Sequence, residues 1–392
     1  MSGAPGADAD LAAVESELHE RARSAAGGRS DFGDPQYRVG LRRLLVSLRD
    51  DQGLDPEAAL DAVAPFAVAR LVGRLYAVDG FNAHPGLCEV ELRDPLFITG
   101  IPRTGTTALH QLLAADSRFQ GLESWLAATP MPRPPRSAWP GIPEFRSAAA
   151  RAAADRARLE AIHWVDAGDY DETLTVLHQT FQMNYSVRGP LPGFEEWYLA
   201  ADARPVYRWA ADVLRLVGST APERPWLLKN PSDIIWSDAV LDVFPGARIV
   251  VTHRDPVAAI PSTVSLLVTL RRGTAGTGVD RRAFDVSAMA ERELRFWKIA
   301  LDRYEAARAR RPDRYLDVWQ RDLLADPLAV VRAIYDWAGL ALSRGTEEAM
   351  RGWIAADAAA RASHRHEPGE LGLDPERIAE TFAGYRARFG FA

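Results

Sequence analysis

The sequence predicts an α/β protein, a P-loop-type doubly wound parallel sheet flanked by helices. Short, almost entirely apolar runs recur along the chain with helical patterns between them, as expected for parallel strands buried on both faces. The first run also leads through a glycine-bounded turn into a helix, which is the arrangement of a phosphate-binding loop. The expected strands are residues 96–99, 226–228, 249–252 and 315–318.

A helical segment precedes the first strand. Between residues 11 and 77, apolar side chains recur three and four positions apart, which predicts amphipathic helices. Residues 1–10 are small and polar, and we expect them to be disordered. Three prolines punctuate this helical pattern: Pro35, Pro56 and Pro65.

We divide the chain into a helical N-terminal segment, residues 1–90, and a P-loop-like α/β domain, residues 91–392. Within the domain, an insert at about 120–222 separates the first two strands. An insert of this size usually shapes the pocket for a second substrate. Its helical patterns cover residues 144–162, 171–181 and 205–217.

Composition narrows the class of protein. The 392 residues carry a net charge of −6, which argues against a nucleic-acid or anionic-membrane surface. The single cysteine, Cys88, excludes an internal disulfide and a cysteine-based zinc cage. No stretch approaches the roughly 18 consecutive apolar residues of a membrane helix, and no secretory signal is recognisable at the N-terminus. We therefore expect a cytoplasmic protein.

The stretch ITGIPRTGTT, residues 98–107, follows the first predicted strand. Backbone N–H groups in such a turn point inward, and a helix N-terminus carries about half a positive charge, so a phosphate is stabilised there. Threonine hydroxyls and the Arg103 guanidinium add further donors. The alternative is an ordinary strand–turn–helix connection. The expected phosphate-binding residues are Pro102, Arg103, Thr104, Gly105, Thr106 and Thr107.

The loop lacks the lysine of kinases and ATPases. In those proteins a lysine after the second glycine reaches the β- and γ-phosphates, and a Ser or Thr holds magnesium. Thr106 stands in the place of that lysine. The sequence therefore predicts a ligand with a single phosphate at the loop rather than a triphosphate.

A second candidate anion site follows the third predicted strand. Arg254 lies in the turn after that strand, and Pro256 suits the first position of the next helix. Ser262 comes eight residues after Arg254, too far for a direct bond, although both side chains could face one anion. The alternative is a capped helix beside a solvated arginine.

Together these motifs resemble those of PAPS-dependent sulfotransferases, in particular the bacterial small-molecule branch. The resemblance covers about residues 95–345 and a tail at 364–374. It implies that residues 102–107 bind the 5′-phosphosulfate end of 3′-phosphoadenosine 5′-phosphosulfate (PAPS), without a metal. It also implies that Arg254 and Ser262 bind the 3′-phosphate, which 3′-phosphoadenosine 5′-phosphate retains as the product.

The resemblance also assigns catalytic roles. Arg103 and Lys229, the latter in the segment WLLKNPSD, would meet the negative charge on the leaving phosphate; alternatively Lys229 is a solvated strand-end residue. Asp233 stands where the branch carries a histidine base. To act as the base it would need a raised pKa or an acidic, phenol-like acceptor; alternatively it caps the following helix. Rival bases are Glu123, His163, Asp171, Glu172, His364 and His366.

The resemblance implies transfer of a sulfuryl group to a hydroxyl of a small molecule, in bacterial secondary metabolism. Ala108 stands where many relatives have an adenine-stacking tryptophan, and Trp319, beside Gln320, either stacks on adenine or lies in the core. A P-loop small-molecule kinase and a catalytically degenerate nucleotide-binding member are the alternative functions. Aromatic side chains of the insert suggest an apolar or aromatic acceptor: Trp125, Trp139, Trp164, Phe181, Phe194, Trp197 and Tyr198.

Overall fold

The computed structural model describes residues 5–159, 165–185, 187, 190–273, 285–361 and 373–391. Within these residues, a sheet of four parallel strands in the order β2-β1-β3-β4 forms the centre of the molecule. This confirms the predicted α/β class, and each strand ends within one residue of its expected bounds. The strands are β1 (Leu96–Gly100), β2 (Leu227–Lys229), β3 (Arg248–His253) and β4 (Tyr315–Trp319).

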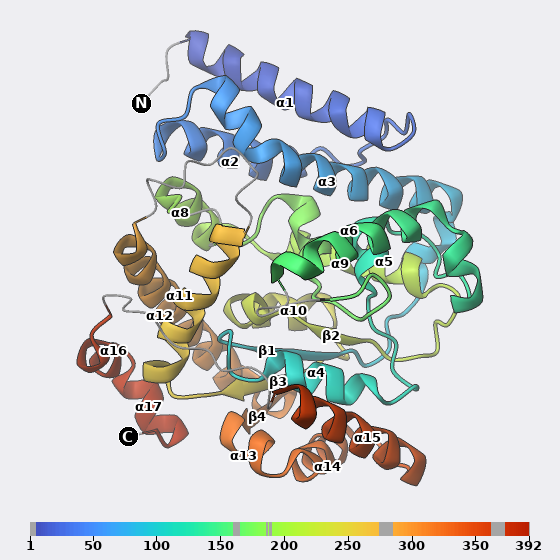
Figure 1. The fold of residues 1–392 in the computed structure, drawn as a ribbon, viewed down its shortest axis with the longest axis vertical. Coiled ribbons are helices and arrows are strands. Elements are labelled where there is room, and N and C mark those ends of the chain that lie inside the picture. Colours follow the sequence, from blue (N-terminus) through green and yellow to red (C-terminus); the bar gives the residue numbers. More distant parts are fainter. Residues whose placement is uncertain are drawn as a thin grey trace.

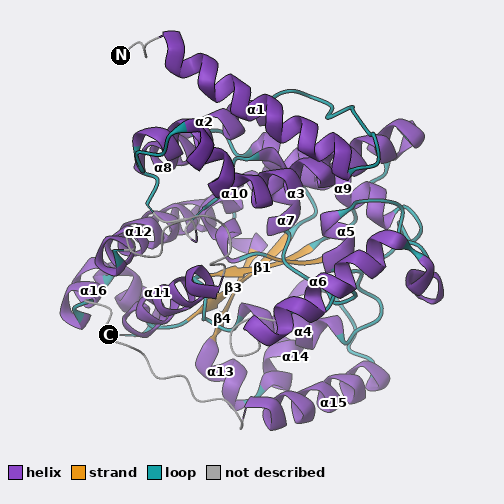
Figure 2. Ribbon diagram, turned by 45° about the horizontal axis from the view of Figure 1, so that its top comes forward, coloured by secondary structure: helices purple, strands orange, loops and turns teal. Residues whose placement is uncertain are grey.

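Helices cover both faces of the sheet and extend above it (Figures 1 and 2). Before β2 they are α1 (Pro5–Ala25), α2 (Tyr37–Asp50), α3 (Pro56–Ala83), α4 (Thr106–Ala114), α5 (Ser124–Ala128), α6 (Pro143–Leu159), α7 (Leu174–Leu177), α8 (Pro192–Ala200) and α9 (Arg204–Gly218). After β2 they are α10 (Ser237–Val243), α11 (Pro256–Gly273), α12 (Val286–Arg310), α13 (Gln320–Ala325), α14 (Pro327–Ala338), α15 (Arg344–Arg361), α16 (Pro375–Thr381) and α17 (Ala383–Phe389).

The pleat of the strands divides the core into two layers. Successive residues of a strand point to opposite faces. Ile98 and Val250 pack with α4, α14 and α15 on one face of the sheet. Phe97 and Val251 join a larger cluster on the other face, which continues through the insert into α1, α2 and α3. The sheet is therefore buried on both sides, as its apolar strands require.

The order of the strands fixes where a ligand can bind. The chain passes from β1 to its neighbour β2, and then crosses to β3 on the opposite side of β1. In open α/β sheets, ligands bind at the carboxyl ends of the strands where the strand order reverses in this way. The loops that follow β1 and β3 meet at this point.

The N-terminal segment differs from expectation in two respects. Helix α1 begins at Pro5, so the disorder expected for residues 1–10 is wrong from that residue onward. Pro65 lies inside α3 and does not interrupt it. Pro56 does mark a boundary, because it occupies the first turn of α3 while the Asp55 carboxylate caps that helix by accepting from the Ala58 N–H.

Arg74 of α3 ties the N-terminal segment to the insert. Its side chain is buried, and its guanidinium donates to the carbonyl oxygens of Phe32 (2.6 Å) and Asp34 (2.8 Å). The guanidinium carbon also lies over the rings of Tyr37 and Trp209, at 4.3 Å and 4.0 Å from the ring centroids. No carboxylate pairs with it among the described residues. Burial lowers the pKa of Arg74 to about 10, so the group stays charged at neutral pH.

We expect Arg74→Met to lower the free energy of unfolding by at least about 2 kcal/mol, because the buried carbonyl groups lose their donor. Urea denaturation followed by circular dichroism measures this difference. Arg43→Met is the control, since Arg43 is exposed on α2 and its loss should change stability by less than about 0.5 kcal/mol. Equal midpoints for both variants would show that Arg74 contributes no stability.

Candidate functional site

The loop after β1 is held close to the end of β3. Gly100 pairs with Thr252 across the sheet, and a Cβ on Gly100 would lie 2.6 Å from the Thr252 carbonyl oxygen. A side chain is therefore excluded at Gly100. The Thr104 hydroxyl closes the turn, since it lies 2.5 Å from the Thr252 hydroxyl and donates to the Ile101 carbonyl (2.7 Å).

The backbone of this loop has the geometry expected of an anion cradle. Arg103 and Gly105 have φ angles of 71° and 100°. Residues with positive φ, alternating with ordinary ones, turn successive N–H groups to the same side. Gly105 is the N-cap of α4, and within the described residues no side chain caps this helix start. The N–H groups of the first turn and the positive end of the helix dipole are thus available to a ligand.

The two motifs predicted to bind anions meet at Arg103. Arg254, 151 residues further along the chain, donates from Nη1 to the Arg103 carbonyl oxygen (3.1 Å). Ser262 of α11 accepts from Arg103 Nε (3.3 Å). Burial, and to a smaller extent the charge of Arg103, lowers the pKa of Arg254. Among the described residues neither guanidinium has a carboxylate partner, so two cations lie together without a counter-charge.

The C-terminal helices hold the residues on either side of Arg254, which the sequence did not indicate. Arg386 of α17 donates to both carboxylate oxygens of Asp255 (3.0 and 3.2 Å). The Tyr385 hydroxyl lies 2.5 Å from Nδ1 of the buried His253. Asp255 is therefore committed to α17 rather than to Arg254. A contact across 131 residues leaves no local signal in the sequence.

Trp319 and Gln320 have separate partners. The Trp319 indole donates to the carbonyl of Phe389 in α17 (2.8 Å), so this ring is fixed by the C-terminal helices. The Gln320 side chain donates to the Arg103 carbonyl oxygen (3.0 Å) and becomes part of the loop's support. No adenine-stacking role for Trp319 follows from these contacts.

Lys229 ends β2 inside the protein. Its side chain is 2% exposed, so the alternative of a solvated lysine is wrong. Nζ donates to Glu172 Oε1 (2.5 Å) and contacts the Thr107 hydroxyl in the first turn of α4 (3.4 Å). His110 of the same helix stays neutral, because burial and the charge of Lys229 lower its pKa to about 3. Glu172 of the insert therefore holds the Lys229 ammonium group beside the first turn of α4.

Asp233 is a buried carboxyl group with one unused oxygen. Oδ1 accepts from the Tyr207 hydroxyl (3.0 Å) and from Asn230 Nδ2 (2.8 Å), whereas Oδ2 has no partner among the described residues. Burial raises the pKa of Asp233 to about 7; the hydrogen bonds oppose this shift and the charge of Glu172 adds to it. Asp233 does not cap a helix, because the Asn230 side chain caps the 3-10 helix η5 (Pro231–Trp236).

The rival bases are mostly committed to other contacts or lie beyond the described residues. Glu123 is buried in an ion pair with Arg133 (3.1 Å). Asp171 accepts from the Glu172 N–H (2.7 Å), and Glu172 itself pairs with Lys229. His163, His364 and His366 lie outside the described residues.

The aromatic residues predicted to line a second pocket are mostly core residues. Trp125, Trp139, Phe181, Phe194 and Tyr198 are each at most 5% exposed and belong to the main hydrophobic cluster. Trp197 packs against that cluster, and Trp164 lies outside the described residues. The abundance of aromatic residues in the insert therefore reflects the packing of its core.

The described residues contain neither a three-ligand metal cluster nor a helix able to cross a membrane. In this part of the chain, no group of three His, Cys, Asp or Glu side chains could hold a metal ion. None of the helices in the same part has the length and apolar character that crossing a membrane requires.

Comparison with known proteins gives consistent matches. The family model described as "Sulfotransferase family" matches residues 95–344. The omega-hydroxy-beta-dihydromenaquinone-9 sulfotransferases Stf3 of Mycobacterium bovis and Mycobacterium tuberculosis are each 26% identical over 264 residues. These matches span 65% of this chain and 65% of the relatives' own length.

Two solved structures have a similar fold over almost the whole chain. Sulfotransferase STF1 from Mycobacterium tuberculosis H37Rv has a TM-score of 0.82 and 32% identity, covering 94% of this chain and 98% of its own. Sulfotransferase STF9 from Mycobacterium avium has a TM-score of 0.82 and 26% identity, covering 96% and 97%. The likeness therefore includes the N-terminal helices, which lie before the region matched by the family model.

The pKa of Asp233 predicts a pH dependence of stability. A carboxyl whose pKa rises on folding binds more protons in the folded state, so stability falls as pH rises from about 4 to about 7. The contribution approaches 1.4 kcal/mol per pH unit. Asp233→Asn should remove this decline, as measured by urea unfolding at pH 5, 6 and 7. Tyr207→Phe should extend the decline to higher pH, because a hydrogen bond that lowers the pKa is lost. Identical slopes for Asp233→Asn and wild type would contradict the raised pKa.

Proposed function

The chain belongs to the sulfotransferase family, and from this premise we propose that it transfers a sulfuryl group from PAPS to a hydroxyl of a small-molecule acceptor. One observation carries the proposal. The Arg103 guanidinium binds Ser262 and the Arg254 guanidinium binds the Arg103 carbonyl oxygen, so two arginines without carboxylate partners among the described residues meet at the loop that leads into the uncapped start of α4. A nucleotide with separate 5′- and 3′-phosphates supplies negative charge to both.

The residues present fit this donor. Residues 102–107 offer N–H groups, hydroxyls and the Arg103 guanidinium to the 5′ end, while Arg254 and Ser262 are the partners proposed for the 3′-phosphate. A kinase would need a lysine at position 106 and a magnesium-binding carboxylate at a strand end. Thr106 occupies the place of that lysine. The loop therefore favours a donor with one phosphate at this end over a triphosphate.

Charge stabilisation and proton removal are the two tasks left to the protein. In the transfer, the bond between sulfur and the 5′-phosphate oxygen breaks, a bond between sulfur and the acceptor oxygen forms, and the hydroxyl proton goes to a base. Lys229 and Arg103 are proposed to stabilise the charge on the leaving oxygen. Asp233 is proposed as the base, since a carboxylate with a pKa of about 7 accepts a proton better than an ordinary one does at neutral pH.

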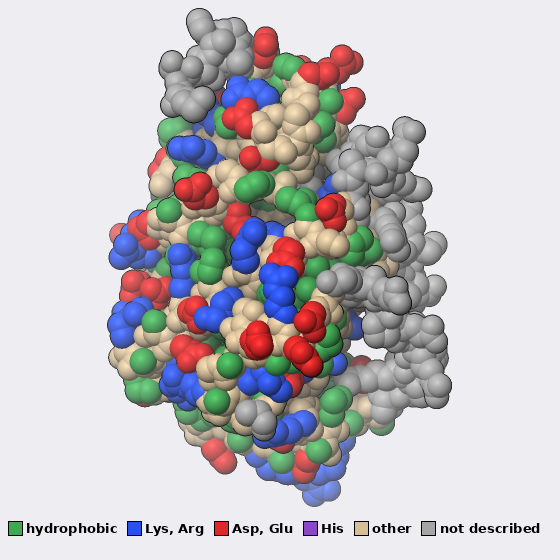
Figure 3. Space-filling view, turned by 90° about the vertical axis from the view of Figure 1, so that its left-hand side faces the viewer, with side chains coloured by type: hydrophobic (Ala, Val, Ile, Leu, Met, Phe, Trp, Pro, Cys, Tyr) green, Lys and Arg blue, Asp and Glu red, His purple; other side chains and the backbone are tan. Residues whose placement is uncertain are grey.

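We propose a small, apolar alcohol as the acceptor. The name of the Stf3 relatives describes a hydroxylated menaquinone derivative as their substrate, which is a lipophilic alcohol. Lys and Arg side chains alternate with Asp and Glu over the face drawn in Figure 3, without a continuous field of one sign. A sulfated or acidic polymer would need an extended basic groove, and this face carries no such run of basic side chains.

Donor identity is tested by ligand-induced stabilisation. We expect 3′-phosphoadenosine 5′-phosphate to raise the thermal midpoint, by roughly 2.7 kcal/mol of added stability at 100 times its Kd, and ATP with magnesium to raise it less. Arg254→Gln should weaken binding at least about tenfold through the loss of a charge-assisted contact.

Arg386→Gln is the matched positioning variant, because Arg386 holds Asp255 beside Arg254. Arg386→Gln should weaken the binding of 3′-phosphoadenosine 5′-phosphate less than Arg254→Gln does. Arg386→Lys should restore part of the lost affinity. Preferential stabilisation by ATP with magnesium would refute the donor and favour the kinase alternative.

The base is tested by the pH dependence of turnover. We expect Asp233→Asn to lower kcat about 10²- to 10⁴-fold and to abolish the rise of kcat through pH 7. Glu172→Gln should keep that rise but move it to lower pH, because the charge of Glu172 raises the pKa of Asp233. Retention of the rise in Asp233→Asn, together with its loss in Glu172→Gln, would identify Glu172 as the base. Sulfate transfer to a panel of alcohols and phenols, followed by mass spectrometry, provides the rates, and no transfer by the wild type would favour a degenerate member.

A further inference from the structure

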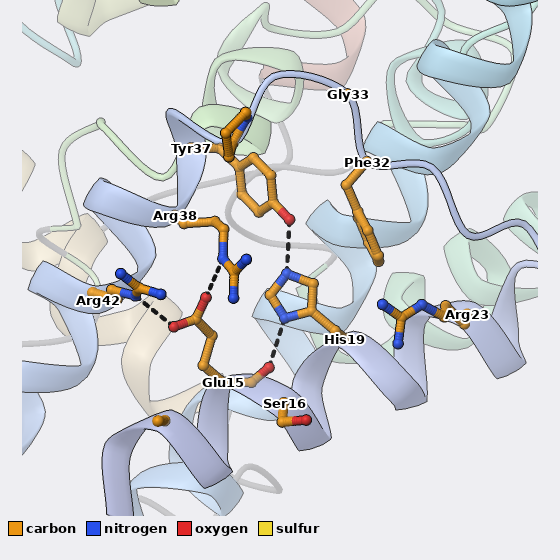
Figure 4. A pocket seen from close by; sticks show the side chains of 11 residues that line it. Glu15, Ser16, His19, Arg23, Phe32, Gly33, Tyr37, Arg38 and Arg42 are labelled. Atoms are coloured by element: carbon orange, nitrogen blue, oxygen red, sulfur yellow. Dashed lines mark hydrogen bonds and ion pairs between the residues drawn. The ribbon is translucent and has the colours of Figure 1, made fainter. Parts of the chain in front are cut away.

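The N-terminal helices enclose a polar cavity away from the proposed PAPS site. It has a volume of about 320 Å³ and lies between α1, α2 and the loop that joins them (Figure 4). It precedes residue 95, where the match to the family model begins. Its lining residues are Ala12, Glu15, Ser16, His19, Arg23, Phe32, Gly33, Pro35, Tyr37, Arg38 and Arg42.

One wall of the cavity carries two arginines around a single carboxylate. Glu15 is 3% exposed; Oε1 accepts from Arg38 Nε (2.5 Å) and Oε2 from Arg42 Nε (2.6 Å). Burial raises the pKa of Glu15, but the hydrogen bonds from Arg42 and Arg38 outweigh it and leave the pKa below its usual value. Glu15 is therefore ionised at neutral pH, and two positive charges share one negative charge.

The arginines use only part of their donor capacity. Both bind Glu15 through Nε. Their terminal amino groups have no hydrogen-bond partner in the described part of the chain. Figure 4 shows the Arg38 guanidinium between Glu15 and His19, with its terminal nitrogens at the cavity. The side chains of Arg38 and Arg42 are 44% and 62% exposed. A ligand can therefore reach these donors. Arg23, on the rim, is already paired with Glu20.

The opposite wall is aromatic, and the Arg23 guanidinium lies 5.5 Å from the centroid of its Phe32 ring. Burial lowers the pKa of His19, so the ring is neutral at pH 7. Its Nδ1 donates to the Glu15 carbonyl (2.6 Å), which leaves Nε2 to accept from the Tyr37 hydroxyl (2.7 Å). Phe32 packs edge-on against His19 at 4.8 Å between ring centroids. The donors of His19 and Tyr37 are thus satisfied, and this wall offers mainly ring surface.

We propose that this cavity binds a small organic anion, with a phosphate or carboxylate group at the free amino groups of Arg38 and Arg42 and a ring or short apolar body against Phe32. Guanidinium groups match both kinds of oxyanion through paired donors. The Ser16 hydroxyl, which also lines the cavity, supplies a further donor. A volume of about 320 Å³ lies at the lower end of the range for small-molecule sites, so the ligand is small.

Phenyl phosphate and benzoate are suitable probes, because each joins a ring to one of the two head groups. Isothermal titration is carried out with 3′-phosphoadenosine 5′-phosphate at saturation, so that the proposed donor site does not contribute. We expect saturable binding of at least one probe to the wild type and at least about tenfold weaker binding to Arg42→Gln. Arg42→Lys, which keeps the charge beside Glu15 but lacks the fork, should bind with intermediate affinity.

Two further variants separate a binding site from a structural clamp. Arg43→Gln is the matched control, because Arg43 is the next residue of α2, is exposed and does not line the cavity. It should bind like the wild type. Glu15→Gln removes the competing negative charge and should bind the probe more tightly.

The proposal is overturned by any of three results. They are no saturable binding to the wild type, equal losses in Arg42→Gln and Arg43→Gln, or an Arg42→Gln variant that is less stable yet binds with unchanged affinity. In the last case Arg38, Arg42 and Glu15 serve only to join α1 to α2.

Discussion

The carbonyl oxygen of Arg103 is the point on which the site depends. It accepts from the Arg254 guanidinium (3.1 Å) and from the Gln320 side chain (3.0 Å), which come from the ends of β3 and β4. Arg103 has a positive φ, which costs of order 1–3 kcal/mol for a residue other than glycine. These contacts offset that cost, and they place the guanidinium of Arg254 against the loop. One strained residue thereby brings segments from three strands together.

A buried polar network holds the backbone next to Arg254 in place. His253 lies between the Tyr385 hydroxyl and Asp317 Oδ1 (3.0 Å), and Asp317 also accepts from Tyr304 (2.5 Å) and from Arg308 (2.5 Å). The network joins β3, β4, α12 and α17. A cation held in this way loses little entropy and needs little reorganisation when an anion binds, which is the basis of electrostatic preorganisation.

The sequence was informative where the signal is local. Strands buried on both faces are apolar at successive positions, so β1 and β3 were predicted to within one residue, and the loop 102–107 follows from its glycines. The surroundings of Lys229 and Asp233 were not predictable, because their partners Glu172 and Tyr207 come from an insert whose path no local pattern determines. The docking of α17 was missed for the same reason. The aromatic residues of the insert were predicted to line a pocket, but most of them lie in the core. Sequence alone does not separate the two, because a core and an apolar pocket use the same residue types.

The charges of Lys229, Glu172 and Asp233 act on one another. Glu172 neutralises Lys229 through a 2.5 Å contact, and its charge raises the pKa of Asp233. On the proposed function, the donor adds negative charge beside Lys229, at the first turn of α4. Negative charge near a carboxyl group raises its pKa further, so Asp233 becomes a stronger base when the donor is bound. Lys229 can then shift its hydrogen bonding from Glu172 toward the leaving oxygen, which leaves the Glu172 charge less compensated and reinforces the effect on Asp233. The buried positions of Lys229 and Asp233 and the half-buried position of Glu172 strengthen this coupling, because charges interact more strongly where water is excluded.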